Sequence, residues 1–377
     1  MKLKIFSDRS YLPKTPLPRT LKYVPILAPF WGEIPEDSKH FKTGRFDKLV
    51  ETGHSFLEMT SLEEADIAIF PAHWHLFSSD EASYNLAIEF IKKAKELGKP
   101  VAIFSQGDWD GEQILENTIV FYTSSFQSRR KPNEFAMPEW TSDFIGQNFN
   151  GQIPIREKMA KPTVGFCGYA PPLGVPFGLD KLKRYLRFYG DILGLTKKFY
   201  TTTGHTNRVK ALTNLSRSDL VETNFIFRQH FAFSSKLELE DPAELERQTQ
   251  KLRLEYCHNL IGSDYVVCCS GYENYCIRLY ETLSFGRIPV FINTDCVMPY
   301  DFAIDWKKYC VWVDESEISS IAEKVADFHN QLSAQEFRDL QYECRKLWED
   351  WISPEGFFRH FYQHLNKIET PKTPVHF

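Results

Sequence analysis

The sequence predicts an α/β fold with two domains, each built on a parallel sheet that carries helices on its faces. Three observations carry this prediction. The chain has 377 residues, whereas a single hydrophobic core stops growing at roughly 250–300 residues. Short β-branched and aromatic runs alternate with amphipathic stretches, which is typical of a doubly wound parallel sheet. This alternation stops at a Pro- and Gly-rich interval, residues 148–161, and then restarts, so we expect a linker there.

The first domain is predicted over residues 1–150 and is Rossmann-like. Its strand candidates are residues 3–7, 23–28, 66–72, 100–105 and 118–124. A helix is predicted between the third and fourth strands. Its apolar side chains recur at helical spacing, and they are Leu86, Phe90, Ile91 and Ala94. Gly98 is suited to end this helix, because glycine readily adopts the left-handed conformation of a helix C-cap.

The second domain is predicted over residues 151–350 and repeats the pattern. Its strand candidates are residues 163–168, 224–229, 263–269, 287–293 and 308–314. Its helical patterns cover residues 182–192, 242–260, 318–332 and 334–351. A last helix and tail over residues 351–377 contain Phe357, Phe361 and Leu365, and packing back on the first domain is one option for them. Two such units facing each other form a cleft lined by the carboxyl ends of strands, where open α/β sheets bind ligands.

Composition narrows the class of protein. The formal net charge is −5, from 45 Lys and Arg against 50 Asp and Glu, so no basic field indicates a nucleic-acid partner. The eight cysteines include no CxxC pair and several lie in apolar runs, which favours reduced core thiols over disulfides or a zinc site. The N-terminus lacks a signal-peptide pattern and no segment reaches membrane-spanning length. We therefore expect a cytoplasmic protein and leave peripheral membrane contact open.

The stretch after the strand at 263–269 carries the clearest functional signal. The strand ends at Ser270-Gly271, and a short helix follows whose positive N-terminal end suits a phosphate. Arg278 lies about one turn inside this helix and offers a bidentate charge to a diphosphate, whereas Glu281, on the same face, can accept hydrogen bonds from two hydroxyls of a ribose. Spacing alone favours an exposed Arg278–Glu281 ion pair instead. There is no GxGxxG or GxxxxGK[ST] motif.

Residues 263–318 resemble the C-terminal signature of the exostosin family of glycosyltransferases. The shared pattern is a strand ending in a Gly turn, an Arg, a Glu one turn later, a Gly-x-(I/V)-P-V strand, an acidic turn, Met-Pro and an apolar-Asp-Trp step. This resemblance implies a two-domain GT-B architecture and transfer from a nucleotide diphosphate donor, usually a UDP-sugar, to a glycan or polysaccharide hydroxyl. It also implies inversion of configuration and no bound metal or other cofactor.

The same resemblance assigns roles around the donor. It makes Arg278 the diphosphate ligand and Glu281 the ribose ligand, and the turn is shaped by Ser270, Gly271 and Asn274. Arg228 resembles a second cationic contact, but a surface arginine closing a strand explains it equally well. Asp295 matches the acidic turn and borders the donor pocket on this interpretation, although a turn-forming Asp accounts for it nearly as well.

One position departs from the family pattern. Glu273 replaces the usual small residue, and the resulting Glu273-x₇-Glu281 spacing is similar to the paired glutamates of retaining GT-B enzymes, the first of which lies near the donor sugar. Inversion remains the favoured interpretation.

An inverting transfer needs a base on the acceptor side, which is expected in the first domain. We favour Asp108, which follows a Gly turn after a strand and stays ionised at neutral pH. His73, His75 and Asp110 are alternatives, and each candidate also fits an ordinary loop residue.

Two other functions remain open. A fucosyltransferase-like GT-B enzyme using GDP-fucose would carry a basic residue beside the Glu, which the run "CIRLYETL" lacks. A non-catalytic carbohydrate-binding protein on the same fold would not need Arg278 to contact phosphate.

Overall fold

The chain was analysed in a computed structural model, which describes residues 2–12, 23–32, 44–76, 81–108, 116–170, 200–228, 242–271 and 273–367. It divides into two compact units, which are described separately. The first unit comprises Met1–Ser142, Val297–Tyr300 and Glu349–Phe377, and the second comprises Asp143–Cys296 and Asp301–Trp348.

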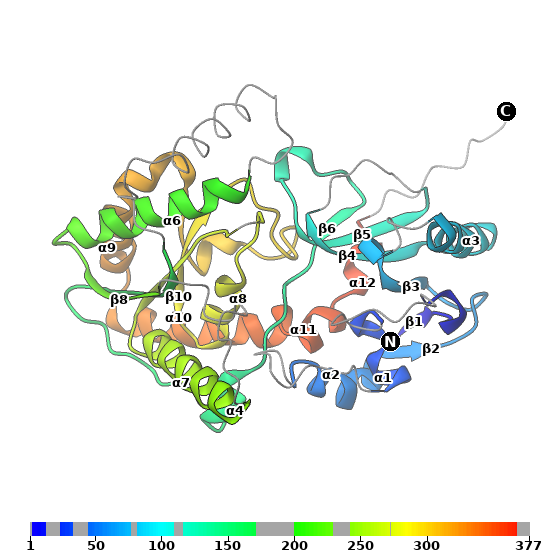
Figure 1. Ribbon diagram of the computed structural model, residues 1–377, viewed down its shortest axis with the longest axis horizontal. Helices are drawn as coiled ribbons and strands as arrows, with labels where there is room; N and C mark the ends of the chain where they lie inside the picture. The colour runs from blue at the N-terminus through cyan, green and yellow to red at the C-terminus, as the bar shows by residue number, and fades with distance from the viewer. Residues whose placement is uncertain are drawn as a thin grey trace. The chain divides into compact units, whose positions relative to one another are not determined.

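The first unit contains a six-stranded sheet in the order β2-β1-β3-β4-β5-β6, and every strand pair in it is parallel (Figure 1). The strands are β1 (Leu3–Phe6), β2 (Leu57–Met59), β3 (Ile67–His73), β4 (Val101–Asp108), β5 (Thr118–Ser124) and β6 (Glu134–Ala136). All residues of β3 and β5 are buried, as expected for a parallel sheet covered on both faces. The short strands β2 and β6 were not predicted.

The helical elements of the first unit are mostly short. They are η1 (Arg9–Tyr11), η2 (Pro25–Leu27), α1 (Ala28–Trp31), α2 (Asp47–Thr52), η3 (Gly53–Ser55), η4 (Trp74–Leu76), α3 (Glu81–Glu96), η5 (Gln127–Arg129), α11 (Pro354–Arg359) and α12 (Tyr362–Leu365). The predicted helix is α3, and Gly98 follows it with φ 67°. Its residues Phe90, Ile91 and Ala94 are buried in the core, as their spacing predicts.

The strand predicted over residues 23–28 is wrong, because this segment forms η2 and the start of α1. Pro25 stands at the first position of η2 and lacks the N–H that a strand would need, while its fixed φ suits a helix start. Val24 still donates a backbone hydrogen bond to Pro71 of β3, 2.9 Å away. An apolar run of six residues cannot by itself separate a strand from a buried helical turn.

The C-terminal helices complete the core of the first unit. The ring of Phe361 lies 4.8 Å from that of Phe121 in β5 and 6.0 Å from that of Phe104 in β4. Trp140 donates from Nε1 to the carbonyl of Ile352, 3.1 Å away. Aromatic packing therefore fastens α11 and α12 to the strands of this unit.

The second unit contains a five-stranded parallel sheet in the order β11-β10-β9-β7-β8. The strands are β7 (Thr163–Tyr169), β8 (Glu222–Arg228), β9 (Tyr265–Cys268), β10 (Ile288–Asn293) and β11 (Val311–Asp314). All five were predicted, with differences of a few residues at their ends. The predicted fold class, two Rossmann-like parallel α/β sheets with C-terminal helices, is confirmed.

Helices of the second unit are longer. They are α4 (Phe144–Asn148), α6 (Tyr200–Arg217), α7 (Pro242–Ile261), α8 (Ile277–Ser284), η6 (Trp306–Lys308), η7 (Glu315–Ser320), α9 (Ile321–Gln331), α10 (Ala334–Leu347) and the π-helical turn η8 (Trp348–Ile352), which leads into the first unit. A capping box of Ser333 and Glu336 starts α10, which ends before the predicted residue 351. The helix predicted over residues 182–192 lies outside the described residues, and α6 was not predicted.

Two arginines stabilise this unit through buried polar groups. Arg287 is fully buried and donates to the carbonyls of Leu260 and Ile261 at the end of α7, 3.2 and 3.0 Å away. Arg156 pairs with the buried Asp264 at 2.5 Å, so the interval expected as a linker is held against the second sheet. These bonds give buried backbone carbonyls and charges the partners that burial requires.

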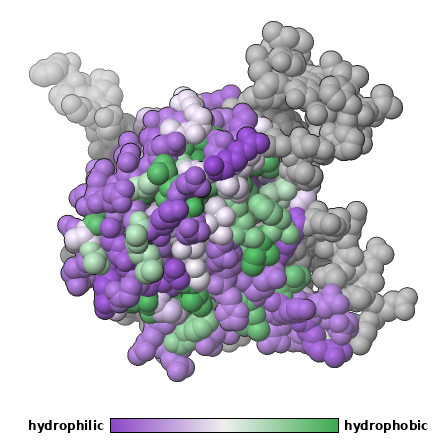
Figure 2. Space-filling model, turned by 90° about the vertical axis from the view of Figure 1, so that its left-hand side faces the viewer, coloured by the Kyte–Doolittle hydropathy of each residue, from purple (hydrophilic) through white to green (hydrophobic). Residues whose placement is uncertain are grey.

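The face in Figure 2 is mostly hydrophilic, and its hydrophobic side chains lie in separate small groups. Within the described ranges, no helix combines the length and the apolar character needed to cross a membrane. All eight cysteines fall in those ranges and are free thiols, seven of them buried, as the sequence predicts.

Acidification is expected to destabilise the first unit through two buried histidines. Burial lowers the pKa of His73 to about 3 and that of His364 to about 3, against about 6.5 in an unfolded chain. The unfolded state therefore binds more protons as the pH falls from 6.5 towards 3, and each histidine removes about 1.4 kcal/mol of stability per pH unit there.

Urea unfolding between about pH 7.5 and pH 5 measures this loss. His364→Asn should flatten the pH dependence, whereas His54→Asn, at an exposed position, should leave it unchanged. A parental slope in His364→Asn would contradict the assignment.

Candidate functional site

The carboxyl ends of β7 and β9 define the candidate site of the second unit. The chain passes from β7 to β8 on one side and returns to β9 on the other, so these two neighbouring strands form a topological switch point. Open α/β sheets bind their ligands outside the strand ends at such a point. The loop after β9 leads to α8, which begins at Ile277 with Cys276 as its N-cap.

Arg278 lies at this switch point. Its Nη2 donates to the carbonyl of Cys167 in β7, 2.8 Å away, and its guanidinium lies 4.4 Å from the ring centroid of Phe166. A Cβ at Gly168 would lie 2.8 Å from Nη2, so the guanidinium approaches the backbone closely. Its Nε is buried and has no hydrogen-bond partner among the described residues. The α8 backbone therefore places a cation at the carboxyl end of β7.

The Arg278–Glu281 ion pair, the simplest alternative on spacing, is not formed. Within the described residues no carboxylate lies at ion-pair distance from Arg278. Glu281 instead accepts a hydrogen bond at Oε2 from the hydroxyl of Tyr256 in α7, 2.5 Å away. Arg278 and Glu281 therefore do not pair directly, although both contact Tyr256.

Tyr256 contacts both Arg278 and Glu281, the two residues predicted to bind the donor. It was not identified from the sequence. Burial raises the pKa of its phenol, and the Glu281 charge raises it further, so the hydroxyl stays protonated and donates. Arg278 lies 5.9 Å from its ring centroid. No spacing rule links Tyr256 to α8, because the contact joins two different helices across the fold.

The predicted turn residues converge around Thr294, which follows β10. Its hydroxyl donates to Oδ1 of Asn274 at 2.7 Å and lies 3.4 Å from Oγ of Ser270. Asn274 donates from Nδ2 to the carbonyl of Asp295, 3.3 Å away. Asp295 has φ 62°, a left-handed conformation that Asp tolerates, so it shapes a turn here. Its contact with a donor stays a prediction.

Two further predicted residues lie nearby. Gly271 belongs to the turn after β9, and Glu273 is partly buried in the loop that leads to α8. The retaining alternative, which depends on Glu273, also stays a prediction.

Arg228, at the end of β8, is turned towards α7. It pairs with Glu255 at 2.8 Å and donates to the carbonyl of Leu252 at 2.9 Å. Burial raises the pKa of the Cys167 thiol, while the charges of Arg228 and Arg278 oppose that rise, so both cations lie close to the end of β7. Glu255 balances the charge of Arg228. The role of Arg228 as a donor contact stays a prediction.

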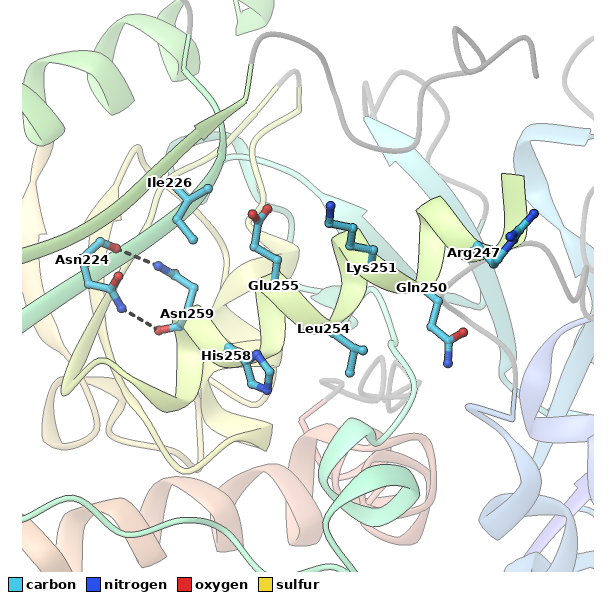
Figure 3. Close-up of a pocket in the computed structure, with 9 residues that line it drawn as sticks. All are labelled: Asn224, Ile226, Arg247, Gln250, Lys251, Leu254, Glu255, His258 and Asn259. Atoms are coloured by element: carbon cyan, nitrogen blue, oxygen red, sulfur yellow. Dashed lines mark hydrogen bonds between the residues drawn. The ribbon is translucent and has the colours of Figure 1, made fainter. Parts of the chain in front are cut away.

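A groove of 730 Å³ runs along α7 beside β8 (Figure 3). Asn224 and Asn259 close one end by exchanging hydrogen bonds of 3.3 and 2.7 Å between amide and backbone groups. Lys251 and Arg247 lie towards the other end of the lining (Figure 3). Glu255 also lines this groove. Because Glu255 pairs with Arg228 at the end of β8, the groove extends to that strand end.

The first unit places the candidate bases at strand carboxyl ends. His73 ends β3 with 1% of its surface exposed, and neither ring nitrogen has a hydrogen-bond partner among the described residues. Burial, and then the charges of His75 and Arg45, lower the pKa of His73 to about 3. An imidazole in this state takes up a proton reluctantly, which argues against His73 as a general base. Burial also lowers the pKa of His75.

Asp108 is the last residue of β4, and its Cα is in register with Ser124 of β5. Gly107, just before it, has φ 87° and donates its N–H to the hydroxyl of Thr123, 3.0 Å away. The predicted Gly turn after this strand is wrong, because Gly107 and Asp108 belong to β4, whose register with β5 shifts between Ser105 and Asp108. The side chain of Asp108 and the whole of Asp110 lie outside the described residues, so the choice of base stays a prediction.

Comparison with known proteins agrees with the sequence signature. Exostosin-1 of Drosophila melanogaster is 29% identical over 115 residues, 30% of this chain and 15% of that protein. A probable glucuronosyltransferase of Oryza sativa subsp. japonica is 36% identical over 63 residues, 17% of this chain and 14% of that protein. The chain resembles exostosin-type glycosyltransferases. No protein-family model matches it.

A third relative is also named as a sugar-transferring enzyme. A probable β-1,4-xylosyltransferase of Arabidopsis thaliana is 35% identical over 63 residues, 17% of this chain and 15% of that protein. In each of these relatives the match spans about a seventh of the curated protein's own length. The predicted similarity to exostosins is confirmed, and it is a similarity over part of the chain.

Loss of the Tyr256 hydroxyl is expected to destabilise the second unit. Tyr256→Phe leaves the Glu281 carboxylate without its partly buried donor, and a hydrogen bond to a charged group contributes about 1.5–3 kcal/mol. Urea unfolding of the variant should show a loss of this size. Tyr342→Phe is the matched control, because Tyr342 is 53% exposed. Equal stability of Tyr256→Phe and the parent would refute the role given to this bond.

Proposed function

We propose that the chain is a glycosyltransferase that moves a sugar from a UDP-sugar to a hydroxyl of a glycan or polysaccharide acceptor. Two of the relatives that it resembles are named as a probable glucuronosyltransferase and a probable β-1,4-xylosyltransferase. The observation that carries the proposal is Arg278, a partly buried cation at a topological switch point with no carboxylate partner within the described residues. Such a cation favours a phosphate-bearing ligand, since guanidinium and phosphate form bidentate, charge-assisted hydrogen bonds.

The donor's two ends meet different groups. Arg278 and the N-terminal amides of α8 bind the diphosphate, because both present positive charge at the strand ends. Glu281 accepts hydrogen bonds from the ribose hydroxyls, and Tyr256 holds one of its oxygens so that the other is oriented. Fixing both ends of the nucleotide places the sugar carbon C1 at a defined position.

The chemical step breaks the bond between C1 and the diphosphate oxygen. Negative charge grows on that oxygen as the bond lengthens, and the guanidinium of Arg278 stabilises it without rearrangement. The proposal includes no bound metal, because this side chain supplies the positive charge.

The acceptor hydroxyl attacks C1 from the face opposite the leaving diphosphate, which inverts the configuration. Its proton passes to a general base, for which we propose Asp108. The new glycosidic bond forms as the C1–O bond to UDP breaks, and UDP leaves with the electron pair. Participation of Glu273 would give retention instead.

Removing the Arg278 charge is expected to weaken nucleotide binding. Arg278→Ala should lower UDP affinity by on the order of 1.5–3 kcal/mol, the scale of a charge-assisted hydrogen bond. Calorimetry with UDP, GDP and TDP on the parent and the variant measures this and identifies the nucleotide. Arg217→Ala, at an exposed position of α6, is the control. Unchanged UDP affinity in a folded Arg278→Ala protein would contradict the proposal.

Replacing the proposed base is expected to slow chemistry without affecting the donor. Asp108→Asn should preserve UDP affinity and lower kcat by about 10²–10⁴, the usual scale for losing a positioned base. Single-turnover transfer with NMR of the product anomer measures rate and stereochemistry together. His75→Ala is the comparison variant. Parental kcat in Asp108→Asn, or a product that keeps the donor's configuration, would contradict this assignment.

A further inference from the structure

One face of α6 packs against the turn that follows β9. Arg208, in the middle of this helix, is 8% exposed. It donates from Nη1 to the carbonyl of Tyr169, 3.0 Å away, and from Nη2 to the carbonyl of Ser270, 3.1 Å away. Tyr169 ends β7 and Ser270 follows β9, so a single guanidinium bridges the two strand ends of the switch point.

Gly204, one turn earlier on the same face, lies against the same turn. A Cβ at this position would lie 2.4 Å from the carbonyl oxygen of Gly271 and 2.7 Å from that of Ser270. Both neighbours are backbone atoms, so the clash could be relieved only by moving the helix or the turn. The thiol of Cys269 also donates to the carbonyl of Gly204, 3.4 Å away.

The helix itself does not require a glycine at position 204. Within a helix, glycine is less favourable than alanine. The close approach of the turn, rather than the helix itself, therefore requires the absence of a side chain there.

Arg208 and Arg278, the residue proposed to bind the diphosphate, both pack against the ring of Phe166. The guanidinium of Arg208 lies 6.0 Å from the centroid of Phe166, and that of Arg278 lies 4.4 Å from the same centroid. The α6 face and Arg278 thus pack around one aromatic side chain of β7.

We propose that Gly204 and Arg208 clamp the Ser270–Gly271 turn in the conformation that receives the diphosphate of a nucleotide donor. They are positioning residues, because they act through the turn and not on the reacting atoms. The clamp rests on the proposed function for the identity of its ligand. Its effect on the turn is a property of the protein without nucleotide, which allows it to be tested separately.

The variant Gly204→Ala distinguishes the proposed clamp from a purely structural role of Gly204 in helix packing. Alanine favours the helix, but its Cβ would clash with the carbonyl oxygens of Ser270 and Gly271, so a merely structural role predicts a lower Tm with parental UDP affinity. The clamp predicts a displaced turn, with UDP affinity lowered on the order of tenfold or more, since small misplacements in a site are costly. Lys210→Ala, at an exposed position of α6, is the control and should match the parent.

Arg208→Lys and Arg208→Gln provide the second test. Lys keeps the charge but has no fork to hold two carbonyls, so the clamp predicts that both variants lose UDP affinity to a similar extent. Full retention by Arg208→Lys with loss in Arg208→Gln would assign the effect to charge alone and overturn the clamp.

Hydrogen exchange in the absence of nucleotide completes the design. Peptides covering Cys269–Gly271 should exchange faster in Gly204→Ala than in the parent or Lys210→Ala. Equal exchange would overturn the clamp even if the parent binds UDP. If the parent binds none of UDP, GDP or TDP, the proposed function fails, and faster exchange in Gly204→Ala would then still identify the contact as one that orders the turn.

Discussion

The charge of Arg278 is the constraint on which the rest of the second unit depends. A cation taken out of water needs compensation, and ion pairing with a carboxylate is the usual form. Here a strand carbonyl and the face of Phe166 hold the guanidinium instead, while Glu281 is engaged by Tyr256. Among the described residues no carboxylate pairs with this guanidinium, which leaves its charge available for the anionic ligand proposed above.

Arginines have contrasting uses within this one unit. Arg287 is fully buried and its hydrogen bonds go to backbone carbonyls and to the side-chain amide of Gln341, so it serves the fold alone. Arg345 binds both carboxylate oxygens of Asp143, at 2.8 and 2.7 Å, and fastens α10 in the same sense. Arg208 bridges two strand ends. Only their contacts distinguish these residues from Arg278, since all four are the same side chain in the sequence.

The sequence predicted the parallel sheets well because buried strands appear as apolar runs and their order follows from alternation with helices. It failed at residues 23–28, where Pro25 starts a helical turn inside such a run. The roles of Arg278 and Glu281 were predicted from the resemblance to the exostosin signature, since their spacing alone favoured an exposed ion pair. Tyr256 and Arg208 were not, because they reach the site from α7 and α6 and no local pattern records a contact between helices. Burial, which weakens His73 as a base, is likewise a property of the folded chain.

Hydrogen exchange of the whole chain with and without UDP tests the central claim most directly, because it locates the ligand without presuming any residue. The account predicts protection by UDP in peptides covering the end of β7, the turn at Cys269–Gly271 and the start of α8. Protection confined to the first unit, or to the groove along α7, would contradict it.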